Sequence, residues 1–353
     1  MSRLTVGLVL AWSACRAENA APSREEPRPT PGDSTVNDTA VNDPADTGSD
    51  STDSAPTDTG ADTGQDSETG DSGGPDTDTQ PPGDWVDVSA SLRNSCGIHQ
   101  DGSLSCWGYD DGTADLNSPP AGTFVAVALA TETACAIAAD GEIACWGNEK
   151  IDSKLLYPPA GQWTALRCGE TTCAAIDNIG SLWWWGYDFA DLIAPSGVYV
   201  AVDVGVGPDS VCAVEESGQL WCWEEDGTEW QPVVGTFVDV AVGSAFGCAL
   251  DASGSPTCWN DENDFADWWD IDEPPSDFYA SMDLDADHGC GVTLAGDAVC
   301  WGYPYEWKGS VSTDAPAGTF RDIAAGSQFS CGVTDDYDAV CWGMDQQGQA
   351  TPP

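Results

Sequence analysis

A repeat with a period of about 40 residues constrains the fold of this chain more than any local pattern does. Each copy opens with an aromatic residue and continues with a short apolar stretch, a Cys, a turn, a second Cys and a Trp. The opening aromatics are Trp85, Phe124, Trp163, Tyr199, Phe237, Tyr279 and Phe320. The recurring Trp residues are Trp107, Trp146, Trp185, Trp223, Trp259, Trp301 and Trp342. The segment from Asp84 to Pro353 therefore contains seven related units.

The pattern within one copy predicts three short antiparallel strands. In the first copy, Trp85 opens an alternating stretch, Cys96 lies in a second strand, and a turn at Gly102 leads to a third strand with Cys106. We expect an all-β fold, a seven-bladed β-propeller, because blades around an axis leave only short, protected strand edges. The loop of roughly 12 to 18 residues after the third strand is expected to add a fourth strand to each blade.

The predicted repeats cover residues 84–122, 123–161, 162–197, 198–235, 236–277, 278–318 and 319–353. A solenoid of stacked repeats is the alternative architecture. Neither terminal copy resembles a capping repeat, which favours the closed propeller.

The cysteines predict disulfides within the blades. With Gly102 in a tight hairpin turn, His99 faces Ser103, which places Cys96 directly opposite Cys106. The same ten-residue step predicts the pairs Cys96–Cys106, Cys135–Cys145, Cys212–Cys222, Cys248–Cys258, Cys290–Cys300 and Cys331–Cys341. We expect a different turn in copy seven, where Tyr337 occupies the place of the glycine.

Copy three departs from this pattern. Its turn carries one extra residue, and Trp184 stands in place of the second Cys. It alone has an additional Cys168, five residues before Cys173, which predicts a Cys168–Cys173 disulfide between the first two strands. Zinc binding and redox chemistry are not favoured, because there is no C-x-x-C pair and the repeats contain only two His residues, His99 and His288.

The N-terminal part predicts export. Residues 1–15 have a basic residue, a short apolar stretch and small residues before Cys15, which is similar to a bacterial lipoprotein signal. We expect Cys15 to be lipidated or else removed with the signal, and the protein to lie in the bacterial cell envelope, as an outer-membrane lipoprotein, or outside the cell. Residues 16–83, rich in Asp, Thr, Ser and Pro, are expected to form a disordered acidic linker.

The formal net charge of the chain limits which partners it can bind. With 10 Lys and Arg against 60 Asp and Glu, the formal net charge is −50, which argues against binding to nucleic acid or to an anionic membrane surface. Membrane association is expected only through a lipid on Cys15. We expect a monomer with no cofactor. Calcium binding lacks a complete loop motif, because His288 and Leu294 occupy its required Gly and Glu positions.

Two variable loops are the candidate ligand-binding site. The loop after the fifth copy packs aromatics among carboxylates, and the loop after the sixth copy adds further aromatics. Exposed aromatics surrounded by polar groups are typical of interaction sites. The candidate residues are Phe265, Trp268, Trp269, Asp270, Tyr303, Tyr305 and Trp307. The alternative is that these aromatics fold back and cover the propeller edge.

The sequence contains no nucleophile elbow, zinc-protease or phosphate-loop motif, and an enzyme is not expected. A glycan-processing or metal-assisted hydrolytic enzyme is the alternative. It would need a convergent polar set in the axial channel, and we find no such set in any one repeat. We therefore predict no catalytic residues and no metal site.

The strings FVDVAVGSAFGCALDASGSPTCW (237–259) and FRDIAAGSQFSCGVTDDYDAVCWGMDQQGQ (320–349) resemble the repeats of the regulator of chromosome condensation family. The resemblance extends from Trp85 to Gln349 and implies a seven-bladed propeller. The nuclear family member's role in nucleotide exchange and chromatin does not suit an exported acidic chain, whereas exported bacterial members imply a binding module. We therefore expect a secreted or surface-tethered module that binds a protein or polysaccharide, with a purely structural envelope protein as a further alternative.

Overall fold

The computed structural model describes residues 83–353 except 111, 113–115, 149–153, 188, 190–191, 208–209, 245, 261–273, 276, 287 and 303–312. The described residues form strands and turns, with no helix that could cross a bilayer. The strands are β1 (Trp85–Ala90), β2 (Asn94–His99), β3 (Leu104–Gly108), β4 (Phe124–Leu129), β5 (Thr133–Ala138), β6 (Ile143–Gly147), β7 (Trp163–Cys168), β8 (Thr172–Asp177), β9 (Leu182–Gly186), β10 (Tyr199–Val204), β11 (Ser210–Glu215), β12 (Leu220–Glu224), β13 (Glu229–Trp230), β14 (Phe237–Val242), β15 (Phe246–Asp251), β16 (Pro256–Asn260), β17 (Tyr279–Leu284), β18 (His288–Thr293), β19 (Ala298–Gly302), β20 (Phe320–Gly326), β21 (Phe329–Thr334) and β22 (Ala339–Gly343).

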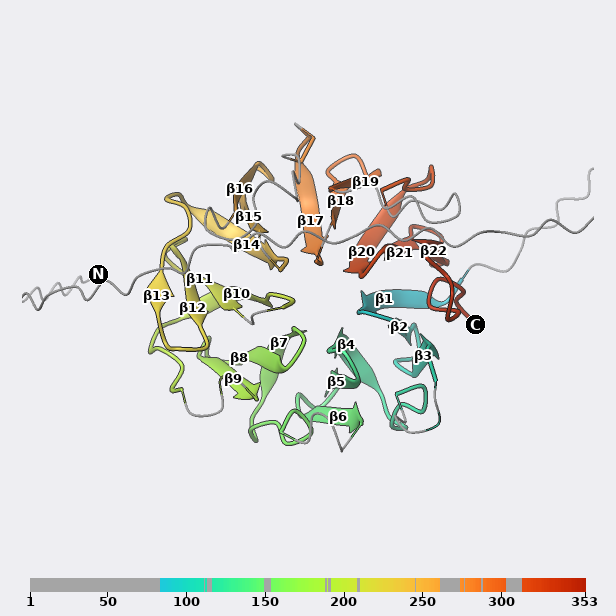
Figure 1. Cartoon of the computed structure of the whole chain (residues 1–353), viewed down its shortest axis with the longest axis horizontal. Coiled ribbons are helices and arrows are strands. Elements are labelled where there is room, and N and C mark those ends of the chain that lie inside the picture. The colour runs from blue at the N-terminus through green and yellow to red at the C-terminus, as the bar shows by residue number, and fades with distance from the viewer. Residues whose placement is uncertain are drawn as a thin grey trace, which may run out of the picture. The chain divides into compact units, whose positions relative to one another are not determined.

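These strands form seven antiparallel sheets, and each sheet uses its strands in chain order. The sheets are arranged around an axis, with the first strand of each nearest the centre (Figure 1). This confirms the seven-bladed propeller. The expectation of a fourth strand in every blade is wrong for the described residues, because only the fourth blade has one, β13, and the other six sheets have three strands. The described residues after the other third strands form turns and connections between blades.

Backbone hydrogen bonds connect each blade to the one before it. The N–H of each opening aromatic donates to the carbonyl of the turn residue in the preceding blade, as in Phe124 to Gly102 at 2.8 Å and Phe320 to Gly296 at 2.7 Å. The ring closes in the same way, because Trp85 N donates to Tyr337 O at 3.0 Å. The first and last copies are thus ordinary neighbours in a closed ring.

The turn of the seventh blade does not differ from the others, contrary to the expectation. Tyr337 itself adopts the left-handed conformation, with φ of 67°, in the place that glycine takes elsewhere. Its N–H donates to Thr334 O at 3.0 Å, which matches Gly296 N to Thr293 O at 2.9 Å in the sixth blade. The Arg321 guanidinium lies 3.9 Å from the centre of the Tyr337 ring, and this contact favours the strained residue.

The recurring Trp residues also join neighbouring blades. The indole N–H of Trp146 donates to Leu116 O at 2.9 Å, in the connection that leaves the first blade. Trp107 makes the same bond, at 2.8 Å, to Gln349 O in the C-terminal segment. Gln349 is buried, so this segment takes the place of an inter-blade connection when the ring closes.

The hydrophobic core lies between blades. One cluster joins the third and fourth blades, where Trp184 lies 5.8 Å from Trp223 and 5.3 Å from Phe189. Another joins the seventh blade to the first, through Trp85, Trp107 and Phe329. Each blade therefore depends on both neighbours to bury its apolar faces.

The structure contains the seven disulfides expected from the cysteine spacing, which are Cys96–Cys106, Cys135–Cys145, Cys168–Cys173, Cys212–Cys222, Cys248–Cys258, Cys290–Cys300 and Cys331–Cys341. Six of them join directly opposed residues of the second and third strands, as in Cys96 and Cys106. Six second strands are thereby tied to their outer neighbours.

The third blade is different because the cysteine of its second strand is displaced along β8. Its hairpin has the usual length, since Asp177 N donates to Ser181 O as His99 N does to Ser103 O. The predicted extra turn residue is therefore wrong. Cys173 instead lies one position earlier along its strand and faces the opposite side of the sheet, directly across from Cys168 of β7.

The two kinds of disulfide should differ in their effect on stability. We expect the double variant C212S/C222S to lose about 3 kcal/mol and C168S/C173S about 2 kcal/mol, because the second pair closes a shorter loop. Urea unfolding, followed by tryptophan fluorescence, measures both losses. A larger loss for C168S/C173S would show that loop length does not control these contributions.

Candidate functional site: the axial cavity

The predicted loop residues lie outside the described part of the chain. This holds for Phe265, Trp268, Trp269, Asp270, Tyr303, Tyr305 and Trp307, and also for Cys15. Their assignments stay predictions. The three sulfur atoms of Cys135, Cys168 and Cys173 lie within 4.8 Å of one another, but each belongs to a disulfide and offers no thiolate to a metal.

The Asp-rich stretch around His288 forms a strand and a turn. Asp283 belongs to β17, and His288 begins β18. His288 is fully buried, with Nε2 2.8 Å from Ser330 Oγ. This histidine is therefore a hydrogen-bonded core residue.

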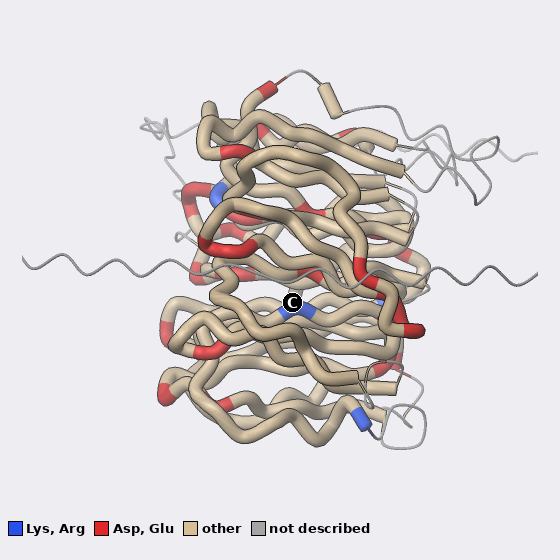
Figure 2. Tube along the Cα trace, turned by 90° about the vertical axis from the view of Figure 1, so that its left-hand side faces the viewer, with Lys and Arg blue, Asp and Glu red and all other residues tan. Residues whose placement is uncertain are grey.

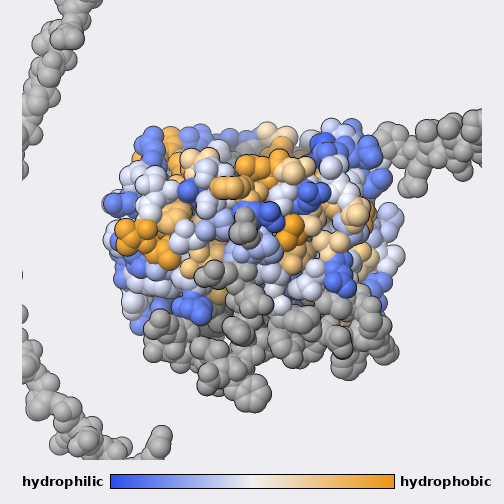
Figure 3. All heavy atoms as spheres, turned by 90° about the horizontal axis from the view of Figure 1, so that it is seen from above, coloured by the Kyte–Doolittle hydropathy of each residue, from blue (hydrophilic) through white to orange (hydrophobic). Residues whose placement is uncertain are grey.

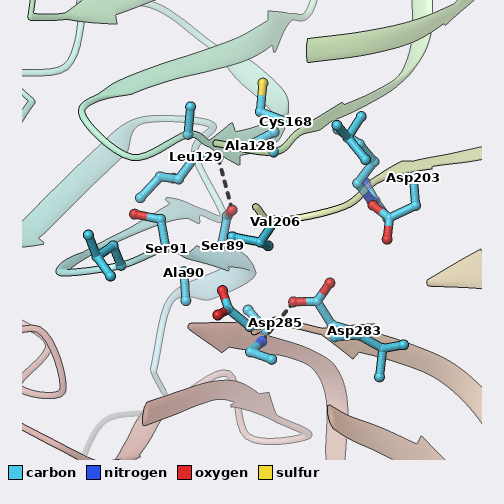
Figure 4. A pocket seen from close by; sticks show the side chains of 18 of the residues that line it. Ser89, Ala90, Ser91, Ala128, Leu129, Cys168, Asp203, Val206, Asp283 and Asp285 are labelled. Carbon is cyan, nitrogen blue, oxygen red and sulfur yellow. Dashed lines mark hydrogen bonds and ion pairs between the residues drawn. The ribbon is translucent and has the colours of Figure 1, made fainter. Parts of the chain in front are cut away.

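The site that the described residues do form is a cavity of about 300 Å³ on the propeller axis. All seven blades line it, six of them through their innermost strands and the turns that follow, and the fifth only through the turn residue Ser244. Side chains such as Ser89, Asp203 and Asp283 lie around the cavity (Figure 4). The opening aromatic is the first residue of each innermost strand. The third and fifth residues of the first blade's strand, Asp87 and Ser89, line the cavity, and other blades contribute one or both of these positions. The turns after these strands, including Ser91 and Asp285, form the mouth of the cavity at one face of the propeller.

Carboxyl groups on the innermost strands of five blades gather at this axis. Asp87, Asp203, Asp283 and Asp322 line the cavity, and Asp239 of β14 lies close enough to influence the same charge. Arg167 is the only Lys or Arg among the described residues that line the cavity. Its Nε lies 3.8 Å from Asp203 Oδ1. Its side chain is 53% exposed, so the guanidinium is accessible from the cavity.

Several of these carboxyl groups also connect adjacent blades. Asp322 Oδ2 accepts a hydrogen bond from Val88 N at 2.9 Å, and Asp87 Oδ2 accepts one from Val127 N at 3.3 Å. In both cases the third residue of one innermost strand binds the N–H of the fourth residue of the next. The bond satisfies a backbone donor that has no partner strand on its axial side.

The fifth residues of the innermost strands make equivalent hydrogen bonds, to the N–H of the sixth residue of the next blade's innermost strand. Asp203 Oδ2 accepts from Val242 N at 2.7 Å, and Asp283 Oδ2 accepts from Ala325 N at 2.7 Å. Ser89 Oγ accepts from Leu129 N at 3.2 Å. The polar residues at the axis therefore have a structural role before any role in binding.

The axis is chemically asymmetric. The second blade contributes Ala126 and Ala128 to the lining, whereas Asp203 and Asp283 come from the fourth and sixth blades. Asp239 of the fifth blade accepts a bond from the neighbouring Val240 N, at 3.0 Å, rather than from the next blade. Carboxyl groups are thus distributed unevenly around the lining, and the second blade contributes none of them.

Burial keeps some of these carboxyl groups protonated near neutral pH. It raises the pKa of Asp203 to about 8, with Arg167 acting in the opposite direction and Asp283 adding to the rise. It raises the pKa of Asp283 to about 6, against the effects of the Ala325 N–H and Arg167. The ion pair with Arg167 therefore does not compensate for the loss of solvent around Asp203.

Asp87 and Asp322 form a hydrogen-bonded pair. Burial raises the pKa of both, and the proximity of Asp87 raises the pKa of Asp322 further. Two adjacent carboxyls cannot both ionise readily, so the pair shares a proton held mainly by Asp322. Burial lowers the pKa of Arg167, but Asp203, Asp283, Asp239 and Asp87 outweigh burial and raise it, so this residue stays charged.

The axial channel contains a convergent polar set, although no single repeat carries it. The set exists because different blades each supply one or two members, so no single repeat contains it. The signal was a fixed offset from the opening aromatic, with Asp87, Asp239 and Asp322 two residues after it and Asp203 and Asp283 four after it. Only the ring arrangement shows that these positions converge.

The raised pKa values predict that stability falls as pH rises. A carboxyl whose pKa is higher in the folded state stabilises the fold below its unfolded value of 3.8, and loses that contribution up to about pH 6 for Asp283 and about pH 8 for Asp203. We expect D203N/D283N to lose less stability than the wild type between pH 5 and pH 8. Urea unfolding at both values measures this, and equal losses in the two proteins would contradict the assignment.

Comparisons with known proteins agree with this architecture. Residues 320–349, most of the seventh blade, match the regulator of chromosome condensation (RCC1) repeat. No curated protein matches the sequence of the chain.

Solved structures show the same fold at low sequence identity. The CRINKLY WD40 ectodomain of the receptor kinase ACR4 from Arabidopsis thaliana has 20% identity and a TM-score of 0.60, with 75% of this chain and 98% of that chain covered. The ectodomain of the receptor kinase CR4 from Physcomitrella patens has 20% identity and a TM-score of 0.56, covering 74% and 73%. Yeast RCC1 (Prp20), solved bound to Kap60, has 14% identity and a TM-score of 0.53, covering 75% and 81%. The chain is therefore a seven-bladed β-propeller that carries the regulator of chromosome condensation repeat.

Proposed function

We propose that this chain is an exported binding module whose axial cavity receives a positively charged group of a partner protein. In this proposal the acidic linker carries the propeller away from a membrane to which a lipid on Cys15 attaches it. Seven disulfides support an oxidising compartment, since such bonds persist outside the reducing cytosol.

The observation that carries the proposal is the imbalance of charge at the axis. Four carboxyl groups, those of Asp203, Asp283, Asp239 and Asp87, act on the charge of Arg167, and the pKa values of Asp203 and Asp283 are raised. A cation in the cavity would stabilise the ionised forms of these groups, so cation binding and proton release are coupled. The volume of about 300 Å³ lies at the lower end of ligand pockets and suits one side chain better than a large ligand.

The geometry favours a Lys or Arg side chain of a protein. The mouth is built from short turns of all seven blades, so a protruding side chain can enter along the axis while its backbone stays outside. A polysaccharide would satisfy the same charge only through cationic amino groups. A purely structural envelope protein does not require an accessible cavity in which Arg167 compensates for only part of the carboxyl charge.

A hydrolytic enzyme is the second candidate, and the Asp87–Asp322 pair is the observation that favours it. Two carboxyls that share a proton can act as general acid and base. Each of these carboxyls also accepts a backbone N–H of the neighbouring blade, which fixes its position for a structural purpose. The binding function accounts for the whole charged set and is therefore preferred.

A pair of neutral and charged probes tests the proposal. We expect N-acetyl-arginine amide to bind the full-length protein, and N-acetyl-citrulline amide, which has nearly the same shape without the charge, to bind at least about tenfold more weakly. Isothermal titration calorimetry measures both affinities. Binding should strengthen from pH 5 to pH 8, because Asp283 and Asp203 ionise in this range.

Two axial variants should change the affinity in opposite directions. D203N/D283N removes negative charge and should weaken arginine binding, whereas R167Q removes the competing cation and should strengthen it. D140N is the matched control, because Asp140 is an exposed turn residue away from the cavity. Equal affinity for both probes, or an equal effect of D140N and D203N/D283N, would contradict the proposal.

A further inference from the structure

The face of the propeller opposite the cavity mouth carries a ring of outward-facing residues. A β-bulge at the same position in the innermost strand of every blade produces this ring. In all seven blades the pairing of the first two strands shifts between the first and third residues, as between Trp85 and Asp87. Such a β-bulge leaves the second residue unpaired and turns its side chain outward. The seven bulge residues, all exposed, are Val86, Val125, Thr164, Val200, Val238, Ala280 and Arg321.

This face is opposite to the mouth of the axial cavity. The opening residues donate to the carbonyls of the hairpin turns, as Tyr199 N does to Gly180 O at 2.8 Å, so strand starts and hairpin turns lie together. The cavity mouth is formed by the turns at the other end of the same strands. We call the face with the hairpin turns the turn face.

Apolar side chains are most numerous on the turn face between the third and sixth blades. Val200 is 53% exposed and Val238 49% exposed. Neighbouring positions add further exposed apolar residues. The apolar arc comprises Ile179, Val198, Val200, Val238, Phe278 and Leu294.

Members of the arc are held together by the contacts between blades. Val198 packs over the hairpin turn that contains Ile179, with its Cγ1 within 2.6 Å of the place a Cβ on Gly180 would take. Leu294 N donates to Phe278 O at 2.8 Å, which holds these two residues side by side. Hydrophobic residues also reach the upper rim of the propeller in the side view (Figure 3). The arc is therefore fixed by the framework rather than by loose loops.

Acidic residues accompany the arc. Glu216, Asp277 and Asp297 are exposed and lie beside arc residues in the chain or across a hairpin. Seen from the side, acidic residues occur at many of the turns along one face of the ring, and basic residues are few (Figure 2). Among the described bulge residues Arg321 is the only cation, and Asp335 lies 3.6 Å from it.

The acidic charge of the turn face argues against a second copy of this chain and against residues 16–83 as its occupant, and favours a basic partner. A second copy of this chain would bring a formal charge of −50 against an acidic face, and residues 16–83 of the chain itself are also acidic. A partner with apolar residues flanked by Lys or Arg would match both the arc and its surroundings. We propose that the turn face is a docking surface for a basic, apolar segment of a partner protein, separate from the axial cavity.

The test uses the full-length protein and a defined probe. An amphipathic peptide of alternating Leu and Lys residues, fluorescently labelled, is titrated with the wild type and followed by anisotropy. We expect V200S/V238S to weaken binding at least about tenfold. The matched control is Y157S/I193S, which removes two exposed apolar residues outside the arc and should leave the affinity unchanged.

The remaining outcomes separate this proposal from the axial one and from nonspecific attraction. The loss of affinity caused by V200S/V238S should be the same in the D203N/D283N background as in the wild type, because the axial carboxyls line the opposite opening. Polylysine should bind the wild type and V200S/V238S equally. The docking surface is rejected if V200S/V238S, shown by near-UV circular dichroism to be folded, binds the Leu-Lys peptide as the wild type does. It is also rejected if the wild type forms a dimer in sedimentation that V200S/V238S does not form.

Discussion

The innermost strand of each blade has one edge with no neighbouring strand, and the ring depends on how that edge is satisfied. Backbone N–H groups at the axis would be unpaired if the lining were entirely apolar. Asp322, Asp87, Asp203 and Asp283 each accept one of these N–H groups from the next blade. Side chains thus do at the axis what backbone pairing does within a sheet, and they join blades that share no continuous sheet.

This solution has a chemical consequence. Carboxyl groups placed to bind backbone donors are brought together at the centre. Burial raises their pKa values there, and neighbouring carboxyls raise the pKa of Asp203 and Asp322 further. Arg167 compensates for only part of this charge. The affinity for cations that we propose therefore arises from the same residues that close the ring, which explains why a structural lining can serve as a binding site.

The two ends of the innermost strands have different chemistry because their backbones differ. At the mouth the strands turn away from the axis, and close approach of neighbouring turns leaves little room; a Cβ on Gly243 would lie 2.5 Å from Asp285 O. At the turn face the bulge directs one side chain per blade outward. One end is therefore a narrow polar opening, and the other is a broad surface with apolar side chains. A propeller with two unlike faces can hold one partner on each.

The sequence by itself determined the blade number, the strand order and the disulfide pairs, because these depend on local spacing that recurs seven times. A ten-residue step across a short hairpin fixes which cysteines face each other, as with Cys96 and Cys106. Local spacing misled only where one position changed. The spacing around Cys173 predicted a longer turn, but Cys173 is displaced by one residue along its strand. The absence of glycine at Tyr337 predicted a different turn type, but Tyr337 itself adopts the left-handed conformation.

Only the tertiary structure shows which residues come together in the axial cavity and in the apolar arc. Asp87 and Asp322 are 235 positions apart in the chain and become partners only when the seventh blade meets the first. Val200 and Val238 read as ordinary strand residues until the bulge turns them outward. Periodicity reports which residues share a position within a blade, but it does not report what converges when seven blades are arranged around one axis. That convergence is set by the closure of the ring, and the proposed functions depend on it.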